Sequence, residues 1–123
     1  MAVIARGQGA SPGAATGPIA LTPEVVVAFA AQGTPAIFVR TEVLAEDMAG
    51  IAACAALVTT RGGITGDGAI AARAMGKPCI AGVLMMRVDY MSKTVLVTGE
   101  VSLTLREGET LTVDASRGVL ERD

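Results

Sequence analysis

Apolar segments rich in strand-forming residues alternate with segments of helical spacing through the centre of this chain. The strand-like segments are Pro35 to Arg40, Ala56 to Thr60 and Pro78 to Val83. A helix is predicted over 45–56, because apolar residues recur there at helical spacing with acids in the first turn. Strand–helix–strand order implies parallel pairing with right-handed crossovers. The alternation therefore predicts an α/β fold.

Local signals mark the ends of the other two predicted helices. Thr22 suits the N-cap of one helix, Pro23 suits its first position, and Gly33 predicts its end. Gly76 and Pro78 stop the helix that follows the second strand-like segment.

The flanking segments have a different texture. Residues Ala5 to Leu21 are rich in glycine and proline, which predicts a turn-rich pair of short strands. From Arg87 onward, short alternating segments broken by Gly and Asp predict antiparallel hairpins. No linker or repeat interrupts the sequence, so we expect a single domain over 1–123, with mixed β-sheet layers and about three helices.

Charge and composition exclude several classes of protein. A net charge of -2 and a pI near 5.1 argue against nucleic-acid binding, and no apolar run approaches the length of a membrane span. Cys54 and Cys79 lie in apolar sequence without CxxC spacing, which favours buried reduced thiols and a cytoplasmic protein. The chain has no histidine, so imidazole cannot serve as base, metal ligand or phosphoryl acceptor.

The stretch RGGITGDGAIAARAMGKP, from Arg61 to Pro78, has the form of a phosphate-binding turn. Its backbone N–H groups could converge on an anion at the start of a helix, and Arg61 could add a bidentate contact. The spacing matches neither the P-loop nor the dinucleotide-binding motif. A tight structural connection is the alternative interpretation.

Asp67 places a negative charge at the centre of this turn. One hypothesis is that it caps the helix by accepting hydrogen bonds from backbone N–H groups, which would repel a phosphate. Another is that its carboxylate accepts phosphate as an acyl phosphate, which normally needs a divalent cation. Glu46 and Asp47 are the only acids that the sequence offers for such a cation, and we expect no metal site.

The segment TTRGGITGDGAIAARAMGKPCIAG resembles the signature of the mobile, or phosphohistidine swivelling, domain of phosphoenolpyruvate (PEP)-utilising enzymes. The resemblance is strongest to pyruvate phosphate dikinases, whose turn reads approximately T-x-R-G-G-x-T-S-H-A-A. GASPGAATG, FVRTEVLAEDMAGI and REGETLTVDASRGVLE resemble further segments of the family. The similarity therefore covers nearly the whole chain.

The resemblance implies a swivelling β/β/α domain that carries a phosphoryl group on a histidine. It also implies two partners, in the same or another chain: an ATP-grasp nucleotide-binding domain and a PEP/pyruvate barrel domain. Mg²⁺ and ATP or PEP would belong to those partners, and we expect no cofactor on this domain alone. Asp67 occupies the histidine position, and family hydroxyls are absent at Val43, Leu44 and Gly66.

The leading hypothesis is a phosphoryl-carrier domain that is degenerate at Asp67. It would act as a docking or regulatory module, or as a domain of a larger PEP-utilising phosphotransferase, and would not be catalytic alone. The alternatives are an active carrier with Asp67 as acceptor, and a small-anion-binding module at the turn. The predicted phosphate-binding residues are Arg61, Gly62, Gly63 and Thr65. Thr65 also matches the threonine that a regulatory kinase modifies in plant dikinases.

Overall fold

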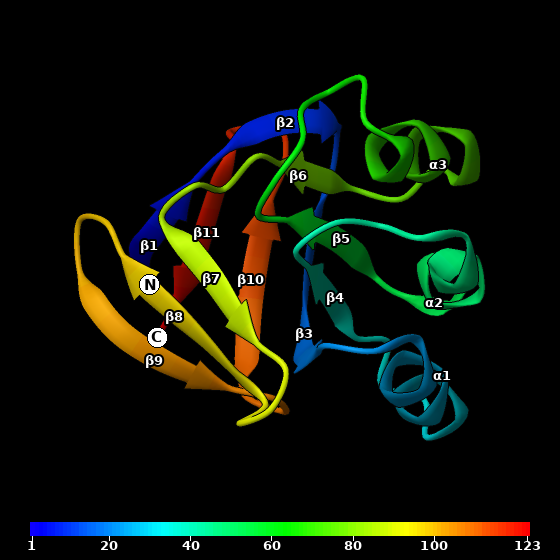
Figure 1. The fold of residues 1–123 in the computed structure, drawn as a ribbon, viewed down its shortest axis with the longest axis horizontal. Helices are drawn as coiled ribbons and strands as arrows, with labels where there is room; N and C mark the ends of the chain where they lie inside the picture. Colours follow the sequence, from blue (N-terminus) through cyan, green and yellow to red (C-terminus); the bar gives the residue numbers. More distant parts are fainter.

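The structure, a computed structural model, describes residues 1–123 and shows three layers (Figure 1). A large mixed sheet has the strand order β1-β11-β10-β3-β4-β5-β6-β2, and a smaller antiparallel sheet has the order β7-β8-β9. The strands are β1 Ala2–Arg6, β2 Gln8–Ser11, β3 Ala14–Ala20, β4 Ile37–Arg40, β5 Ala56–Thr59, β6 Cys79–Ala81, β7 Met86–Asp89, β8 Thr94–Thr98, β9 Ser102–Arg106, β10 Thr110–Asp114 and β11 Val119–Arg122. The helices are α1 Pro23–Ala31, α2 Met48–Ala53 and α3 Asp67–Met75, with a 3-10 helix over Ala45–Asp47.

The predicted parallel core is confirmed. Strands β3, β4, β5 and β6 pair in parallel, and one helix crosses over between each successive pair. All three helices cover the same face of these strands (Figure 1). A cluster of 12 buried residues, including Phe38 and Ile51, fills the space between the sheet and the helices. The fold is therefore the expected mixed α/β domain of β/β/α type.

The first strands join the two edges of the large sheet. Strand β1 pairs with β11 at one edge and β2 pairs with β6 at the other, with only Gly7 between them. A Cβ on Gly7 would lie 2.7 Å from side-chain atoms of both Ile80 and Val83, so the chain crosses here only because this residue has no side chain. A second cluster of 19 buried residues lies inside the curved sheet, beneath β7-β8-β9.

Two segments differ in detail from the prediction. Residues 5–21 contain the predicted pair of short strands, β2 and β3, and Gly13, with a φ of +121°, lies between them. They also contain the end of β1, which Gly7 separates from β2. The predicted helix over 45–56 is shorter, because Cys54 adopts an extended conformation and the Ala55 N–H donates to the carbonyl of Ala36. The predicted ends of the other helices are confirmed, with Gly33 and Gly76 in the left-handed region.

Both cysteines are buried and unpaired on the helix side of the sheet, as predicted. Burial raises the pKa of the Cys54 thiol to about 11, although the Lys77 charge opposes the shift. Burial raises the pKa of the Cys79 thiol to about 12, and its neighbour Cys54 adds to the increase. Both side chains therefore remain protonated thiols at neutral pH.

This protonation predicts slow alkylation of the native protein. A pKa two units above the ordinary 9.0 lowers the thiolate fraction of Cys54 at pH 8 about 100-fold, and burial further limits access. We expect iodoacetamide to modify both thiols at least that much more slowly in buffer than in urea, measured by mass spectrometry. Equal rates in the two solvents would contradict the buried environment.

Candidate functional site

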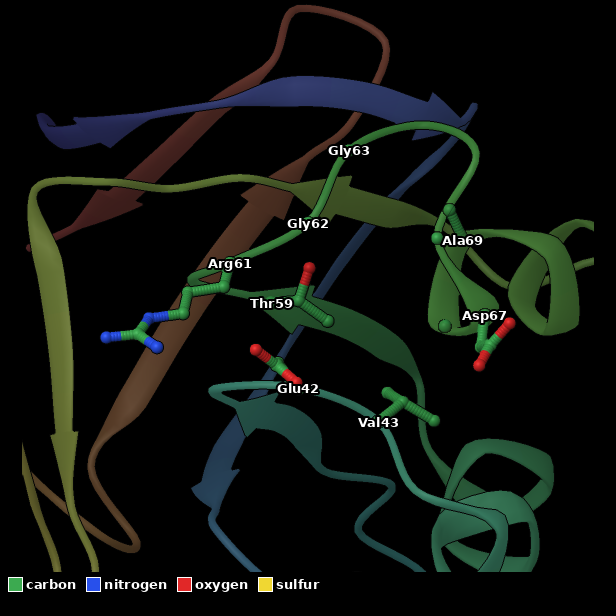
Figure 2. A pocket seen from close by; sticks show the side chains of 10 residues that line it. Glu42, Val43, Thr59, Arg61, Gly62, Gly63, Asp67 and Ala69 are labelled. Carbon is green, nitrogen blue, oxygen red and sulfur yellow. The ribbon is translucent and has the colours of Figure 1, made fainter.

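The glycine-rich turn connects β5 to α3 at the carboxyl ends of the parallel strands. Ligands of open α/β sheets bind in this position, where loops leave the strand ends. A pocket of about 160 Å³ lies here (Figure 2). We call it the turn pocket, and it is lined by Glu42, Val43, Thr59, Arg61, Gly62, Gly63, Gly66, Asp67, Gly68 and Ala69.

The structure corrects the expected capping role of Asp67. Gly66 is the N-cap of α3, with φ -70° and ψ 162°, and Asp67 is the first helical residue. No side chain forms a cap hydrogen bond at this helix start, because the N-cap residue is a glycine and Asp67 lies one position inside the helix. The exposed carboxylate of Asp67 points instead toward Val43 (Figure 2). It still lies at the positive end of the helix.

The predicted phosphate-binding residues separate in space. Gly62 and Gly63 line the turn pocket with Asp67, and Gly62 has a φ of +84°. Figure 2 shows the Arg61 side chain directed away from Asp67, toward β7. Thr65 is exposed and is not among the residues that line the pocket. Their roles as phosphate ligands stay predictions.

Two polar side chains that line this pocket were not among the predicted site residues. Thr59, the last residue of β5, is 5% exposed, and Glu42 follows β4 in the facing loop. Glu42 lies in the segment FVRTEVLAEDMAGI, whose similarity to the family was the available signal. With Glu42 and Asp67 the turn pocket holds two carboxylates, and its one arginine points elsewhere (Figure 2).

The facing loop and the start of α3 pack closely against each other. A Cβ on Gly68 would be 2.7 Å from Cγ2 of Val43. The Val43 methyl group therefore occupies the space that a side chain would need at position 68.

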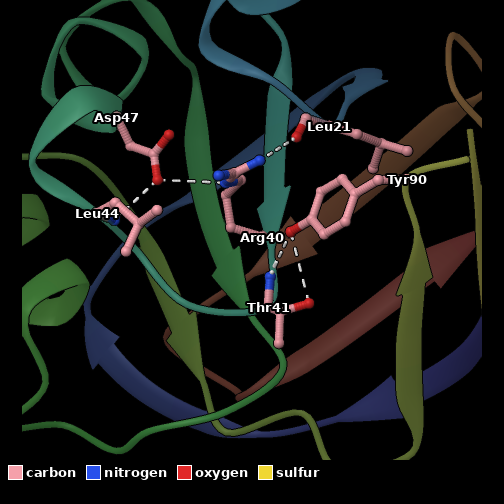
Figure 3. Close-up of polar contacts among 6 residues, drawn as sticks. All are labelled: Leu21, Arg40, Thr41, Leu44, Asp47 and Tyr90. Carbon is pink, nitrogen blue, oxygen red and sulfur yellow. Dashed lines mark hydrogen bonds and ion pairs between the residues drawn. The ribbon is translucent and has the colours of Figure 1, made fainter.

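A buried ion pair holds the loop that carries Glu42 and Val43 (Figure 3). Arg40 Nε donates to Asp47 Oδ2 at 3.2 Å, and the same oxygen accepts from the Leu44 N–H at 2.8 Å. Arg40 also donates to the Leu21 carbonyl at 2.9 Å. Asp47 is fully buried, and its second oxygen, Oδ1, has no partner.

Tyr90 ties this loop to the smaller sheet. Its hydroxyl oxygen accepts a hydrogen bond from the Thr41 N–H at 3.0 Å, and Figure 3 shows its ring beside Arg40. The Arg40 guanidinium carbon lies 5.0 Å from the ring centre, within the range of a cation–π contact. One tyrosine after β7 thereby fixes both the loop and the arginine that anchors it.

The acids that the sequence offered for a divalent cation are not at the turn pocket. Asp47 pairs with Arg40, and Glu46 lines a different hollow near Pro23 and Val27. No group of three or more Asp, Glu, His or Cys side chains is placed to hold a metal ion. The helices are also too short to cross a membrane.

Fold and site together define a β/β/α domain with a glycine-rich turn at the start of its third helix, the arrangement of phosphoryl-carrier swivelling domains. The family described as PEP-utilising enzyme, mobile domain, matches residues 32–118. The chain therefore belongs to that family. Within the family it is a swivelling domain of the pyruvate phosphate dikinase type.

The relatives are much longer proteins. Over 116 residues, the chain is 47% identical to "Pyruvate, phosphate dikinase 2" of Oryza sativa subsp. japonica and 40% identical to "Pyruvate, phosphate dikinase" of Rhizobium meliloti (strain 1021). It is 42% identical to "Pyruvate, phosphate dikinase 1, chloroplastic" of Arabidopsis thaliana. These matches cover 94% of this chain but only 12% to 13% of each relative.

The buried network predicts unequal losses of stability. Asp47→Ala leaves Arg40 without its counter-charge and should lower the free energy of unfolding by about 3 kcal/mol. Tyr90→Phe keeps the ring over Arg40 and loses only the hydroxyl contact, so it should lower the free energy of unfolding by only about 1 kcal/mol. Urea unfolding monitored by circular dichroism measures both.

A third variant separates the parts of the Tyr90 contribution. Tyr90→Leu also removes the ring and should cost more than Tyr90→Phe. If the free energy of unfolding of Asp47→Ala were within about 0.5 kcal/mol of that of the parent chain, the ion pair would not anchor the loop.

Proposed function

We propose that this chain is the swivelling domain of a PEP-utilising phosphotransferase that has lost phosphoryl carriage at residue 67 and acts as a docking or regulatory module. The observation that supports this most directly is that two carboxylates, Asp67 and Glu42, line the turn pocket. The chain contains no histidine that could carry a phosphoryl group. Catalysis would reside in partner domains, which would bind Mg²⁺ and ATP or PEP.

Electrostatics explains why such a pocket would not carry phosphate. A histidine nitrogen is a nucleophile near neutral pH, whereas a carboxylate repels an incoming phosphoryl group. The repulsion between two unit charges 4 Å apart is roughly 1 to 4 kcal/mol at effective dielectrics between water and a protein surface. Asp67 and Glu42 both contribute, which offsets the attraction of the α3 N-terminus.

The surface beside Asp67 supports a docking role. Leu44, Ile64 and Ile70 are 50%, 48% and 52% exposed, and Leu44 and Ile70 line a shallow apolar hollow that also includes Asp67. Apolar side chains gathered at one point of a surface are typical of protein contacts. The proposed partners are an ATP-grasp nucleotide-binding domain and a PEP/pyruvate barrel domain. The cytoplasmic location stays a prediction, since some relatives are named as chloroplastic enzymes.

Restoring the histidine tests the lost function. We expect no label on the parent chain after incubation with a dikinase nucleotide-binding domain, Mg²⁺ and ATP labelled in all its phosphates. Asp67→His should acquire an acid-labile, base-stable label, because a phosphohistidine can then form. Scintillation counting after acid and base treatment measures it.

Position-matched controls accompany this experiment. Glu24→His places a histidine in the first turn of α1, also exposed, and should remain unlabelled. If Asp67→His stays unlabelled, the three missing hydroxyls are restored in a Val43→Thr, Leu44→Ser, Gly66→Ser, Asp67→His variant. Failure of that variant as well would overturn the proposal that the site is inherited from a carrier.

The docking surface is tested in the Asp67→His background. Adding Ile70→Glu should lower the initial labelling rate about tenfold, because a charge would be buried against the partner domain. Val27→Glu, at a 47% exposed position on α1, is the matched control and should label at the same rate as Asp67→His alone. Equal rates for the two variants would place the docking surface elsewhere.

A second candidate function is an aspartyl-phosphate carrier. The observation in its favour is that Glu42 joins Asp67 in the turn pocket, since Mg²⁺ binds through one or two carboxylates together with phosphate oxygens. This candidate predicts a base-labile, hydroxylamine-sensitive label on the parent chain. The label would disappear in Asp67→Asn and weaken in Glu42→Gln, and such a result would replace the degenerate carrier.

A further inference from the structure

A second polar pocket lies on the other side of the glycine-rich turn. It has a volume of about 280 Å³ and lies between the start of the turn and the smaller sheet. We call it the arginine pocket, and its lining residues are Thr41, Thr60, Arg61, Leu84, Met85, Met86, Arg87 and Thr98. Like the turn pocket, it lies where β4 and β5 end.

The alternation of side chains along β5 sends neighbouring residues to the two pockets. Leu57 packs in the cluster beneath the helices, and Val58 packs in the cluster beneath β7-β8-β9. The same alternation continues beyond the core. Thr59 lines the turn pocket and Thr60 lines the arginine pocket.

Thr60 is a nearly buried lining residue of the arginine pocket. It is only 5% exposed, and its backbone N–H donates to the Arg40 carbonyl at 3.0 Å. Its hydroxyl is therefore a candidate hydrogen-bond donor to a ligand in the pocket.

Charge distinguishes the two pockets. The arginine pocket is lined by Arg61 and Arg87 and by no acid, whereas the turn pocket contains two carboxylates. Neither arginine takes part in any of the five ion pairs of the structure. Figure 2 shows the Arg61 guanidinium turned toward β7, which carries Arg87.

The nearest acid along β7, Asp89, forms no ion pair with Arg87. The Asp89 carboxylate accepts hydrogen bonds from the backbone N–H groups of Met91 and Ser92 at 3.1 and 3.2 Å. The contacts with Ser92 are the main reason that the pKa of Asp89 lies below its usual value, and the Arg87 charge contributes less. Asp89 is also not among the residues that line the pocket.

We propose that the arginine pocket binds a small tetrahedral oxyanion, with inorganic phosphate as the simplest member of the class. The guanidinium groups of Arg61 and Arg87 would donate charge-assisted hydrogen bonds to its oxygens, and the Thr60 hydroxyl would donate a third contact. In this proposal, the turn binds an anion in the arginine pocket and not in the turn pocket that contains Asp67. This proposal does not depend on the loss of phosphoryl carriage.

A phosphate titration at constant ionic strength tests the site, with amide and arginine NεH shifts followed by NMR. Shifts are expected at Thr60, Arg61, Arg87 and Thr98, with half-saturation below about 10 mM, and not at residues 66–69. Chloride over the same range should leave these signals in place.

Substitutions identify the groups that bind. Arg87→Gln should weaken phosphate binding about tenfold, because it removes one charged donor, and Thr60→Val about threefold. Arg106→Gln, an exposed arginine on β9 outside the pocket, is the matched control and should leave the affinity unchanged.

Three results would overturn the proposal: no shift up to about 10 mM phosphate, shifts centred on residues 66–69, or equal affinities for Arg87→Gln and Arg106→Gln. Tighter binding in Asp67→Asn together with shifts at 66–69 would assign the anion to the turn pocket. None of these NMR measurements involves transfer of label from ATP. Failure here is therefore distinguishable from failure of the proposed function.

Discussion

The ion pair between Arg40 and Asp47 is the interaction on which the geometry of both pockets depends. It joins the end of β4 to the loop that follows, and Tyr90 covers it from the smaller sheet. A buried carboxylate is tolerated only when its charge is paired, and here the pairing oxygen also accepts from the Leu44 N–H. The loop therefore has one position, which sets where Glu42 lies relative to the turn.

The three-layer arrangement then divides the chemistry of the turn. Because β5 is covered by helices on one face and by β7-β8-β9 on the other, its last residues alternate between two environments. Thr59 lines the turn pocket together with the glycines and the start of α3. Thr60 lines the arginine pocket together with Arg61 and Arg87. A single sequence motif thus serves two pockets, which explains why reading it as one binding loop was incomplete.

Local signals in the sequence were sufficient for the parallel core. The apolar strands, Gly33 and Gly76 each act through backbone preferences that do not depend on distant residues. The closure of the sheet by β1 and β2 was not predictable in this way, because it depends on Gly7 passing close to Ile80 and Val83, more than 70 residues away. The second helix ended earlier than predicted for the same kind of reason. The Ala55 N–H donates a hydrogen bond to the carbonyl of Ala36, the residue before β4.

The site was predicted in part for similar reasons. The resemblance placed Asp67, Gly62 and Gly63 at one pocket, where the structure also has them. Whether Asp67 caps α3 depends on whether the helix begins at residue 67 or one residue later. The direction of the Arg61 side chain depends on tertiary packing. The sequence motif alone determines neither. The N-terminus of α3 offers about half a positive charge, against two full negative charges from Glu42 and Asp67. An anion that approaches this end of the sheet is therefore repelled on the Asp67 face and attracted on the face that holds two arginines.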